Sequence, residues 1–261
     1  MELSKTKLGV YASLDSVRMR RKHGLWLAEG EKLVADTRGA FMAEALVVTP
    51  RWLEANPGVL GFEPESVRTA TPDVMKRLSN MMTPPEVVAV YRLPDEPEPS
   101  AVIFPSDRLV LMLDGVRDPG NLGTIVRTAD WFGVYDIVAS PDCADIFNPK
   151  TVQATMGAVS RVRISYLPLA EVIAANPGMP VYGTLLEGAD IYAAHLTPGG
   201  FIIMGNEGQG ISPAVRGLIG RPLYIPPYGG GGHGESLNVA AATAVTVAEF
   251  RRRASDPAGR Q

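Results

Sequence analysis

The chain has 261 residues, of which 46% are hydrophobic and 20% are charged. It can therefore bury a core, and disorder of the whole chain is excluded. This length fits one large domain or two small ones. The formal net charge of −3 argues against a protein wrapped in nucleic acid through its overall charge, but it leaves room for local basic clusters.

The chain has few residues for disulfides or metal sites. The single cysteine, Cys143, excludes an intramolecular disulfide scaffold and argues against a structural zinc site. Residues 1–10 lack the apolar core of a signal peptide, and the longest mostly apolar stretch, 239–248, is too short to span a bilayer. We therefore expect a cytoplasmic protein without a metal ion or a membrane anchor.

Helices and strands alternate through the first 92 residues, which predicts a small α/β domain. Leu8, Tyr11, Leu14 and Val17 recur at helical spacing. Further elements are expected as a short apolar run over 25–27, a helical piece over 33–35, a buried strand over 45–49, a helix over 72–78 capped by Thr71, and a last strand over 86–91.

Basic residues gather near the start of the chain. Asp15 is the only acid between residues 5 and 22. The residues that we expect to contact nucleic acid are Arg18, Arg20, Arg21 and Lys22. A solvated helix face explains such a run of charge equally well, so charge alone leaves both interpretations open.

A break in the pattern separates two domains. Residues 93–100 carry three prolines and three acids, which disfavours both a helix and a strand. We expect a linker over 93–107 between a domain at 1–92 and a domain at 108–254, followed by a frayed tail at 255–261.

The second domain alternates strands and helices more strongly, which predicts a mostly parallel α/β sheet with helices on both faces. One helix is expected over 122–132, and a long alanine-rich helix over 237–253. Expected strands lie at 109–113, 136–139, 162–166, 180–185, 201–204 and 223–225.

Ligands of such sheets collect at the carboxyl ends of the strands, and three junctions there stand out. The first, residues 114–123, contains three glycines and leads into a helix that Asn121 can cap. Arg127 lies about 200° around this helix from Ile125. It therefore points away from the face that packs on the sheet, toward a ligand. A capped helix with a surface arginine explains the same pattern.

The second junction, residues 205–212, has three glycines around Glu207. Their spacing is neither the dinucleotide fingerprint nor a phosphate loop. The Glu207 carboxylate can fix an arginine through two hydrogen bonds, although a tight turn with an exposed acid is the simpler interpretation.

The third junction, residues 225–238, contains the glycines 229–232 and His233 ahead of a helix start. Ser236 is a natural cap for that helix. Asn238, placed one turn into the helix, is not explained by capping.

Taken in order, these segments resemble the three motifs of the SpoU (TrmH-type) branch of the SPOUT RNA methyltransferases. Residues 121–133 resemble motif one, 204–211 resemble motif two, and Ile225-Pro226 followed by 236–239 resembles motif three. Residues 17–34 resemble the L30e-like RNA-binding module that is often fused to this domain.

The resemblance implies a SPOUT α/β-knot fold, with a mostly parallel sheet and a C-terminal trefoil knot, preceded by a small L30e-like α/β domain that binds the RNA substrate. It also implies a homodimer with S-adenosylmethionine bound in the knotted loops. The implied reaction is methylation of a ribose 2′-hydroxyl, in ribosomal RNA rather than transfer RNA because the fused module is more typical of ribosomal-RNA enzymes. A transfer-RNA 2′-O-methyltransferase and a non-catalytic RNA-binding dimer of the same fold are the alternatives.

Matched residue by residue, the motifs imply Arg127 as the catalytic arginine, which orients the hydroxyl. The residues implied around it are Asn121, Glu207, Ser236 and Asn238. The implied cofactor contacts are Thr184, Leu185, Met204, Gly205, Ile225, Pro226, Ser236 and Leu237.

Overall fold

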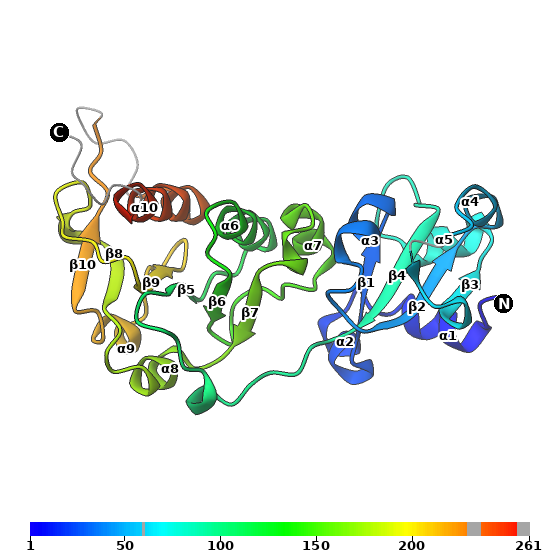
Figure 1. Ribbon diagram of the computed structural model, residues 1–261, viewed down its shortest axis with the longest axis horizontal. Coiled ribbons are helices and arrows are strands. Elements are labelled where there is room, and N and C mark those ends of the chain that lie inside the picture. Colours follow the sequence, from blue (N-terminus) through cyan, green and yellow to red (C-terminus); the bar gives the residue numbers. More distant parts are fainter. Residues whose placement is uncertain (59–60, 229–235, 255–261) are drawn as a thin grey trace. The chain divides into compact units, whose positions relative to one another are not determined.

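The computed structural model describes residues 1–58, 61–228 and 236–254 (Figure 1). Contacts divide the chain into two compact units. The first contains Met1–Asp95 with Asp145–Arg161, and the second contains Glu96–Ala144 with Val162–Gln261. Within the described ranges, no helix is long and apolar enough to cross a membrane.

The first unit is built on a four-stranded sheet in the order β1-β4-β2-β3. The strands are β1 (Leu25–Glu29), β2 (Ala43–Val48), β3 (Val67–Thr69) and β4 (Val87–Arg92). Strand β4 runs antiparallel to β1 and β2, while β3 is parallel to β2. The expected small α/β domain is confirmed. Strand β3 was missed because three residues carry too little pattern to predict a strand.

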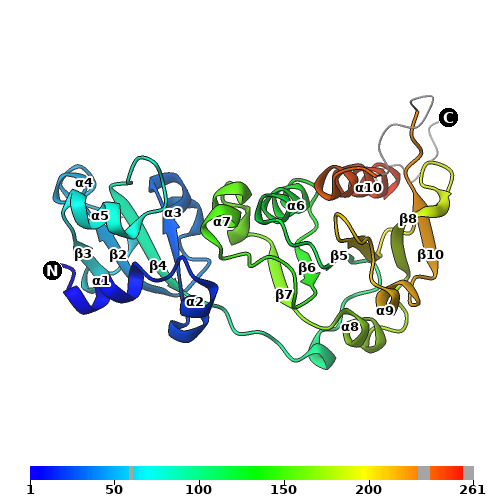
Figure 2. The same cartoon turned by 180° about the vertical axis from the view of Figure 1, so that it is seen from behind.

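Two helices, α1 (Lys5–Tyr11) and α5 (Pro72–Leu78), cover one face of this sheet (Figure 2). Leu8, Tyr11 and Leu14 are buried there, as the helical spacing predicts. Val17 differs, because it begins a separate helix, α2 (Val17–His23), and is 42% exposed. Residues 1–95 also contain helices α3 (Glu31–Thr37) and α4 (Pro50–Ala55) and the 3-10 helix η2 (Pro64–Ser66).

A segment from the middle of the chain completes the core of this unit. Residues 145–161, which the sequence analysis placed within 108–254, contain helix α7 (Pro149–Thr155). The Phe147 ring lies 4.9 Å from the Trp26 ring, which also contacts Phe41 and Tyr91. Because Trp26 is fully buried in this aromatic cluster, the first unit is formed from two separate stretches of sequence.

Arg20 fixes the same segment by an ion pair. Its guanidinium donates through Nε and Nη2 to Asp145 Oδ2, at 3.0 and 2.6 Å, and through Nη1 to the carbonyls of Leu14 and Asp15. The residue is 1% exposed, whereas Arg18, Arg21 and Lys22 are exposed. Burial therefore removes Arg20 from the surface group that we expected to contact RNA.

The second unit contains a six-stranded, wholly parallel sheet in the order β10-β8-β9-β5-β6-β7. Its strands are β5 (Leu109–Asp114), β6 (Asp136–Ala139), β7 (Arg163–Tyr166), β8 (Val181–Asp190), β9 (Gly200–Gly205) and β10 (Arg221–Tyr224). The predicted parallel sheet is confirmed. Strand β8 runs five residues beyond its expected end at Leu185.

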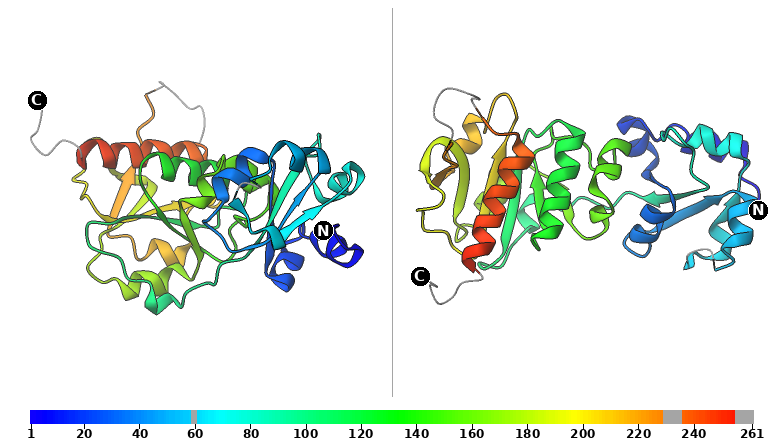
Figure 3. Two further views of the ribbon diagram at one scale, coloured as in Figure 1. Left: turned by 45° about the vertical axis from the view of Figure 1, so that its right-hand side comes forward. Right: turned by 90° about the horizontal axis from the view of Figure 1, so that it is seen from above.

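Helices cover both faces of this sheet, as Figures 1 and 3 show. Helices α6 (Pro119–Trp131) and α10 (Val239–Ala254) pack side by side on one face. Helices α8 (Leu169–Ala175) and α9 (Pro213–Arg216) lie on the other, where Val172 and Val215 belong to the same hydrophobic cluster as Val110, Met112 and Ile203. Alternate residues of the buried strands thus serve two cores.

Part of the expected linker is held by the second unit. Glu96 accepts a hydrogen bond from the backbone of Tyr166 at 3.1 Å. The Asn176 side chain accepts from Phe104 N and donates to Val102 O, both at 2.8 Å. The boundaries at 92 and 108 stay a proposal. The expected tail at 255–261 lies outside the described residues.

The buried ion pair gives a stability prediction. Arg20→Ala leaves Asp145 without its partner and should lower the free energy of unfolding by about 3 kcal/mol, because removing one member of a buried pair strands the other. Urea unfolding followed by tryptophan fluorescence measures this change. Arg18→Ala, at an exposed position of the same helix, should change it by less than about 0.5 kcal/mol. Equal effects of the two substitutions would show that the ion pair does not stabilise the unit.

Candidate functional site

Two of the three loops singled out in the sequence begin side by side. Strands β5 and β9 are parallel neighbours, and Asp114 at the end of β5 is in register with Gly205 at the end of β9. The loops that follow them therefore start at the same edge of the sheet. Asp114 strengthens the junction, because its buried carboxylate accepts a hydrogen bond from Ser212 N at 2.7 Å.

A chain of hydrogen bonds joins all three loops. Asn121 Nδ2 donates to Glu207 Oε1 at 2.8 Å, and Asn238 Nδ2 donates to Asn121 Oδ1 at 3.0 Å. Each of these residues comes from a different loop, so the structure brings together three of the predicted site residues. We call this chain, Asn238 to Asn121 to Glu207, the amide relay.

The orientation of each amide in the relay is determined by its neighbours. Asn238 Oδ1 accepts from Ala240 N at 2.9 Å and Ala241 N at 3.2 Å, so its Nδ2 faces Asn121. Asn121 then presents its own Nδ2 to the Glu207 carboxylate. The relay thus ends on the Glu207 carboxylate, whose Oε1 accepts the hydrogen bond.

These contacts correct two assignments of helix caps. Asp118, not Asn121, caps α6, because Asp118 Oδ1 accepts from Asn121 N at 2.8 Å. At the start of α10 the capping side chain is Asn238 rather than Ser236, since α10 begins at Val239. Capping therefore explains Asn238 after all, and its amide nitrogen remains available for the relay.

Arg127 lies on α6 with its side chain exposed, while Ile125 and Ala129 are buried on the opposite face. This is the orientation that the helical spacing predicts. Among the described residues no hydrogen bond or ion pair engages its guanidinium, so its donors are available to a ligand.

Strand β8 provides an opening for a cofactor. It pairs with β9 over Val181–Gly183, and with β10 at Tyr182, Gly183, Ala189 and Asp190. Because the register shifts between the two halves of the β10 ladder, residues 184–188 have no partner in either ladder. Thr184 Oγ1 lies 3.8 Å from the Met204 sulfur, and Leu185 packs beside the core. A break in the ladder beside apolar side chains can accommodate a heteroaromatic ring, so these residues fit a nucleoside-type cofactor.

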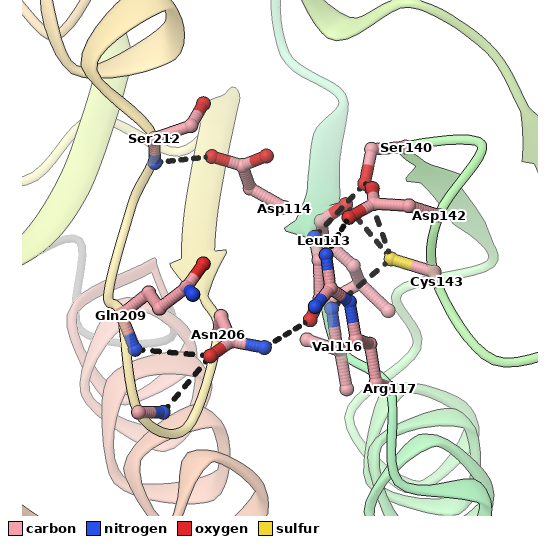
Figure 4. Close-up of polar contacts among 12 residues, drawn as sticks. Leu113, Asp114, Val116, Arg117, Ser140, Asp142, Cys143, Asn206, Gln209 and Ser212 are labelled. Carbon is pink, nitrogen blue, oxygen red and sulfur yellow. Dashed lines mark hydrogen bonds and ion pairs between the residues drawn. The ribbon is translucent and has the colours of Figure 1, made fainter.

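The turn after β9 brings the chain back onto the strand. Asn206 Oδ1 accepts from the backbone nitrogens of Gly208 and Gln209, both at 2.9 Å, and Asn206 Nδ2 donates to Gly115 O at 2.6 Å (Figure 4). A Cβ at position 205 would overlap the backbone of Gly210 and Ile211. Gly205 is therefore required for the turn itself, apart from any cofactor contact.

The remaining predicted contacts are less constrained. Ile225 and Pro226 follow β10 and are half-buried, while Ser236 and Leu237 are exposed ahead of α10. The glycines 229–232 and His233 lie outside the described residues. The structure thus groups Thr184 with Met204 and joins Asn121, Glu207 and Asn238, but it shows no hydrogen bond that joins Ser236 to either group.

A second network at this edge was missed in the sequence. Ser140 Oγ accepts from Gly115 N at 2.9 Å and donates to Asp142 Oδ1 at 2.6 Å, while Arg117 Nη2 donates to Asp142 Oδ2 at 2.8 Å (Figure 4). Hydrogen bonds from Ser140 and Arg117 lower the pKa of Asp142 below its usual value. Residues 140–143 follow a predicted strand next to β5, and that position was the available signal.

Comparisons with known proteins agree over most of the chain. The model of the SpoU rRNA Methylase family matches residues 108–248, and the MRM3-like substrate binding domain matches residues 8–89. The 23S rRNA (guanosine(2553)-2′-O)-methyltransferase RlmP of Bacillus subtilis is 31% identical over 250 residues, which cover 94% of this chain and 96% of that protein.

Solved structures show the same similarity. A structure from Porphyromonas gingivalis assigned to the TrmH family is 39% identical, with a TM-score of 0.85, and covers 97% of this chain and 100% of that one. The AdoMet-bound rRNA methyltransferase from Sinorhizobium meliloti is 28% identical, with a TM-score of 0.84, over 97% of this chain and 98% of the other.

Cys143 gives a test of the second network. Its thiol accepts from Val116 N at 3.2 Å and donates to Leu113 O at 3.3 Å, and burial raises its pKa. Less thiolate forms at a given pH, so iodoacetamide at pH 8 should alkylate the native protein about tenfold more slowly than the urea-unfolded protein. Mass spectrometry over time measures both rates. Equal rates would contradict the packing of this loop.

Proposed function

Because the chain belongs to the SpoU rRNA methylase family, we propose that it methylates a ribose 2′-hydroxyl of ribosomal RNA. The observation that carries this proposal is the amide relay, which ties one residue from each family motif into a single hydrogen-bonded unit. The chain is an S-adenosylmethionine-dependent methyltransferase, as its relatives are.

The cofactor would be held by residues from three adjacent strands. Thr184 and Leu185 lie where β8 lacks ladder partners, and the buried Met204 lies beside them, with its sulfur 3.8 Å from Thr184 Oγ1. The other proposed contacts, Gly205, Ile225, Pro226, Ser236 and Leu237, lie on β9 or flank β10 and α10. When bound, S-adenosylmethionine supplies a methyl group on a positively charged sulfur.

Arg127 would act on the ribose. A guanidinium with a pKa above about 12 is a poor base, so we assign Arg127 the tasks of orienting the 2′-hydroxyl and stabilising the charge that develops on its oxygen. An RNA phosphate can take the proton. Most of the acceleration would come from alignment of the reacting atoms, which demands a rigid frame.

The amide relay supplies that frame. Glu207 receives the Asn121 amide and also faces the Asn206 amide at 3.5 Å, so its carboxylate is held between two loops. We propose that this fixed carboxylate positions the groups that surround the ribose. Asn121 and Asn238 are then positioning residues, and their effect depends on Glu207.

The choice of ribosomal over transfer RNA rests on two similarities. RlmP, whose alignment covers 94% of this chain, is named as a 23S rRNA methyltransferase. Residues 8–89 match a substrate-binding domain. The exposed residues Arg18, Arg21 and Lys22 on α2 would contact RNA phosphates there. Arg20 is not part of this group because it is buried.

Three further expectations stay predictions. A homodimer agrees with the exposure of Trp131, 85%, near the end of α6, since a large apolar side chain at the surface often marks an interface. The trefoil knot and the cytoplasmic location also belong to this proposal. A dimer would be detected by analytical ultracentrifugation.

The function can be tested with ribosomal RNA from a strain that lacks this gene. The protein should transfer the methyl group of labelled S-adenosylmethionine to that RNA, and mapping of 2′-O-methyl sites should find one position that the parent strain carries and the mutant lacks. Cofactor binding without transfer to ribosomal or transfer RNA would favour a non-catalytic RNA-binding dimer.

The assigned role of Arg127 predicts a split between turnover and cofactor binding. Arg127→Ala should lower kcat by about a thousandfold or more, because charge at the reacting oxygen is no longer stabilised. The affinity for S-adenosylmethionine, measured by calorimetry, should stay within about twofold, which also serves as the control for folding. Turnover that survives in this variant would contradict the assignment.

The basic residues of α2 predict a salt effect. Reversing the charge of Arg18, Arg21 and Lys22 to glutamate should weaken RNA binding by about tenfold or more and flatten its dependence on salt, because fewer counterions are released. The matched control reverses Arg51, Lys76 and Arg77, which are exposed on α4 and α5. If both triple variants lose the same affinity, α2 has no specific role.

A further inference from the structure

Arg117 lies at the edge of the proposed active site and has no role in the proposed reaction. It lies in the loop between β5 and α6, directly before Asp118, which caps α6. Asn121, the centre of the amide relay, follows on the first turn of the same helix. Arg117 is therefore fixed to the element that carries both Asn121 and Arg127.

A closed ring of hydrogen bonds holds this arginine. Gly115 N donates to Ser140 Oγ, Ser140 donates to Asp142, and Arg117 donates to the other oxygen of the same carboxylate (Figure 4). The backbone of residues 115–117 closes the ring, because it carries both Gly115 N and the Arg117 side chain. Gly115 has φ of +70°, a conformation that favours glycine. The guanidinium is restrained before any ligand arrives.

Most of the guanidinium remains available. The bond to Asp142 uses Nη2, and the Arg117 side chain is 59% exposed. A guanidinium has five N–H donors in a planar fork, so several of them face solvent. The hydrogen bond and the negative charge of Asp142, with a smaller effect from Glu207, raise the pKa of Arg117. The guanidinium therefore keeps its positive charge.

The strand order indicates which anion this arginine would meet. The proposed cofactor residues come from β8, β9 and β10, on one side of Glu207 and Asn121. Arg117 and Asp142 follow β5 and β6, which lie on the other side of the boundary between β9 and β5 that the relay bridges. The proposed function places the ribose at the relay between them, and the 3′-phosphate of that ribose is then the nearest anion of the substrate. The cofactor carboxylate is the other possible anion, but its proposed contacts lie across the relay.

We propose that Arg117 binds a backbone phosphate of the RNA next to the methylated ribose, and that Asp142 positions it. This inference rests on the proposed function. The planar fork matches two phosphate oxygens at once, which a lysine ammonium does not. A restrained arginine loses less side-chain entropy on binding than a free one, which explains why an ion pair stands at the edge of the site.

The test compares steady-state kinetics on ribosomal RNA from a strain that lacks the gene. Arg117→Ala should raise KM for RNA by about tenfold, with kcat within about twofold. It should also reduce the slope of log KM against log salt by about 0.7, the value for one phosphate on a single strand. Arg117→Lys should restore the salt slope of the parent protein, but it should reverse only part of the rise in KM. Asp142→Asn keeps the arginine charge, so its slope should stay near that of the parent while KM rises.

The control is Arg163→Ala. Arg163 is also exposed and paired with a carboxylate, that of Asp136, but it begins β7 and so lies at the opposite edge of the same sheet. The Arg163→Ala substitution should leave KM for RNA and the salt slope unchanged. A lower affinity of Arg117→Ala for S-adenosylmethionine in calorimetry would assign the arginine to the cofactor instead. Unchanged KM and slope would overturn the inference, whereas no methylation by the parent protein would contradict the proposed function itself.

Discussion

The hydrogen bond from the Asn121 amide to the Glu207 carboxylate joins residues that are 86 positions apart in the sequence. It depends on a single feature of the sheet, the parallel register that places the ends of β5 and β9 side by side. Once that register is set, the two following loops have to share one edge. The third loop is then attached by Asn238, whose amide nitrogen is directed to Asn121 because its oxygen caps α10. The Asn238 side chain thus both caps α10 and joins the third loop to the site.

The regions on the two sides of the amide relay are built differently, because one has to admit a cofactor and the other has to hold the RNA. On one side of the relay, β8 leaves its ladder over residues 184–188, where we propose that the cofactor binds. On the other side, Ser140 and Cys143 hydrogen-bond the backbone of residues 113, 115 and 116 and so restrain it. A methyl transfer needs both properties, since the donor has to enter and leave while the acceptor has to be held in line.

Sequence patterns predicted the alternating strands, the buried core positions and the orientation of Arg127, because each depends on local spacing. They failed where the outcome depends on contacts between distant residues. Arg20 looks like its basic neighbours, and only the approach of Asp145 and two carbonyls makes it a core residue. Asp118 rather than Asn121 caps α6, and Asn238 rather than Ser236 caps α10, for the same reason, since any of the four can cap a helix. Family motifs named the residues of the relay, but the bonds between them could not be read from spacing.

The passage of residues 145–161 through the first unit has a consequence for how such proteins can be rearranged. The chain passes between the two units three times rather than once, after Asp95, Ala144 and Arg161. Removing residues 1–95 alone would strip the aromatic partners from Phe147 and leave Asp145 without Arg20. Grafting a different substrate-recognition module onto this catalytic sheet would therefore require a matching exchange of the internal segment. Recombination at a single junction would yield a chimera with a broken core, which favours inheritance of the two parts as a pair.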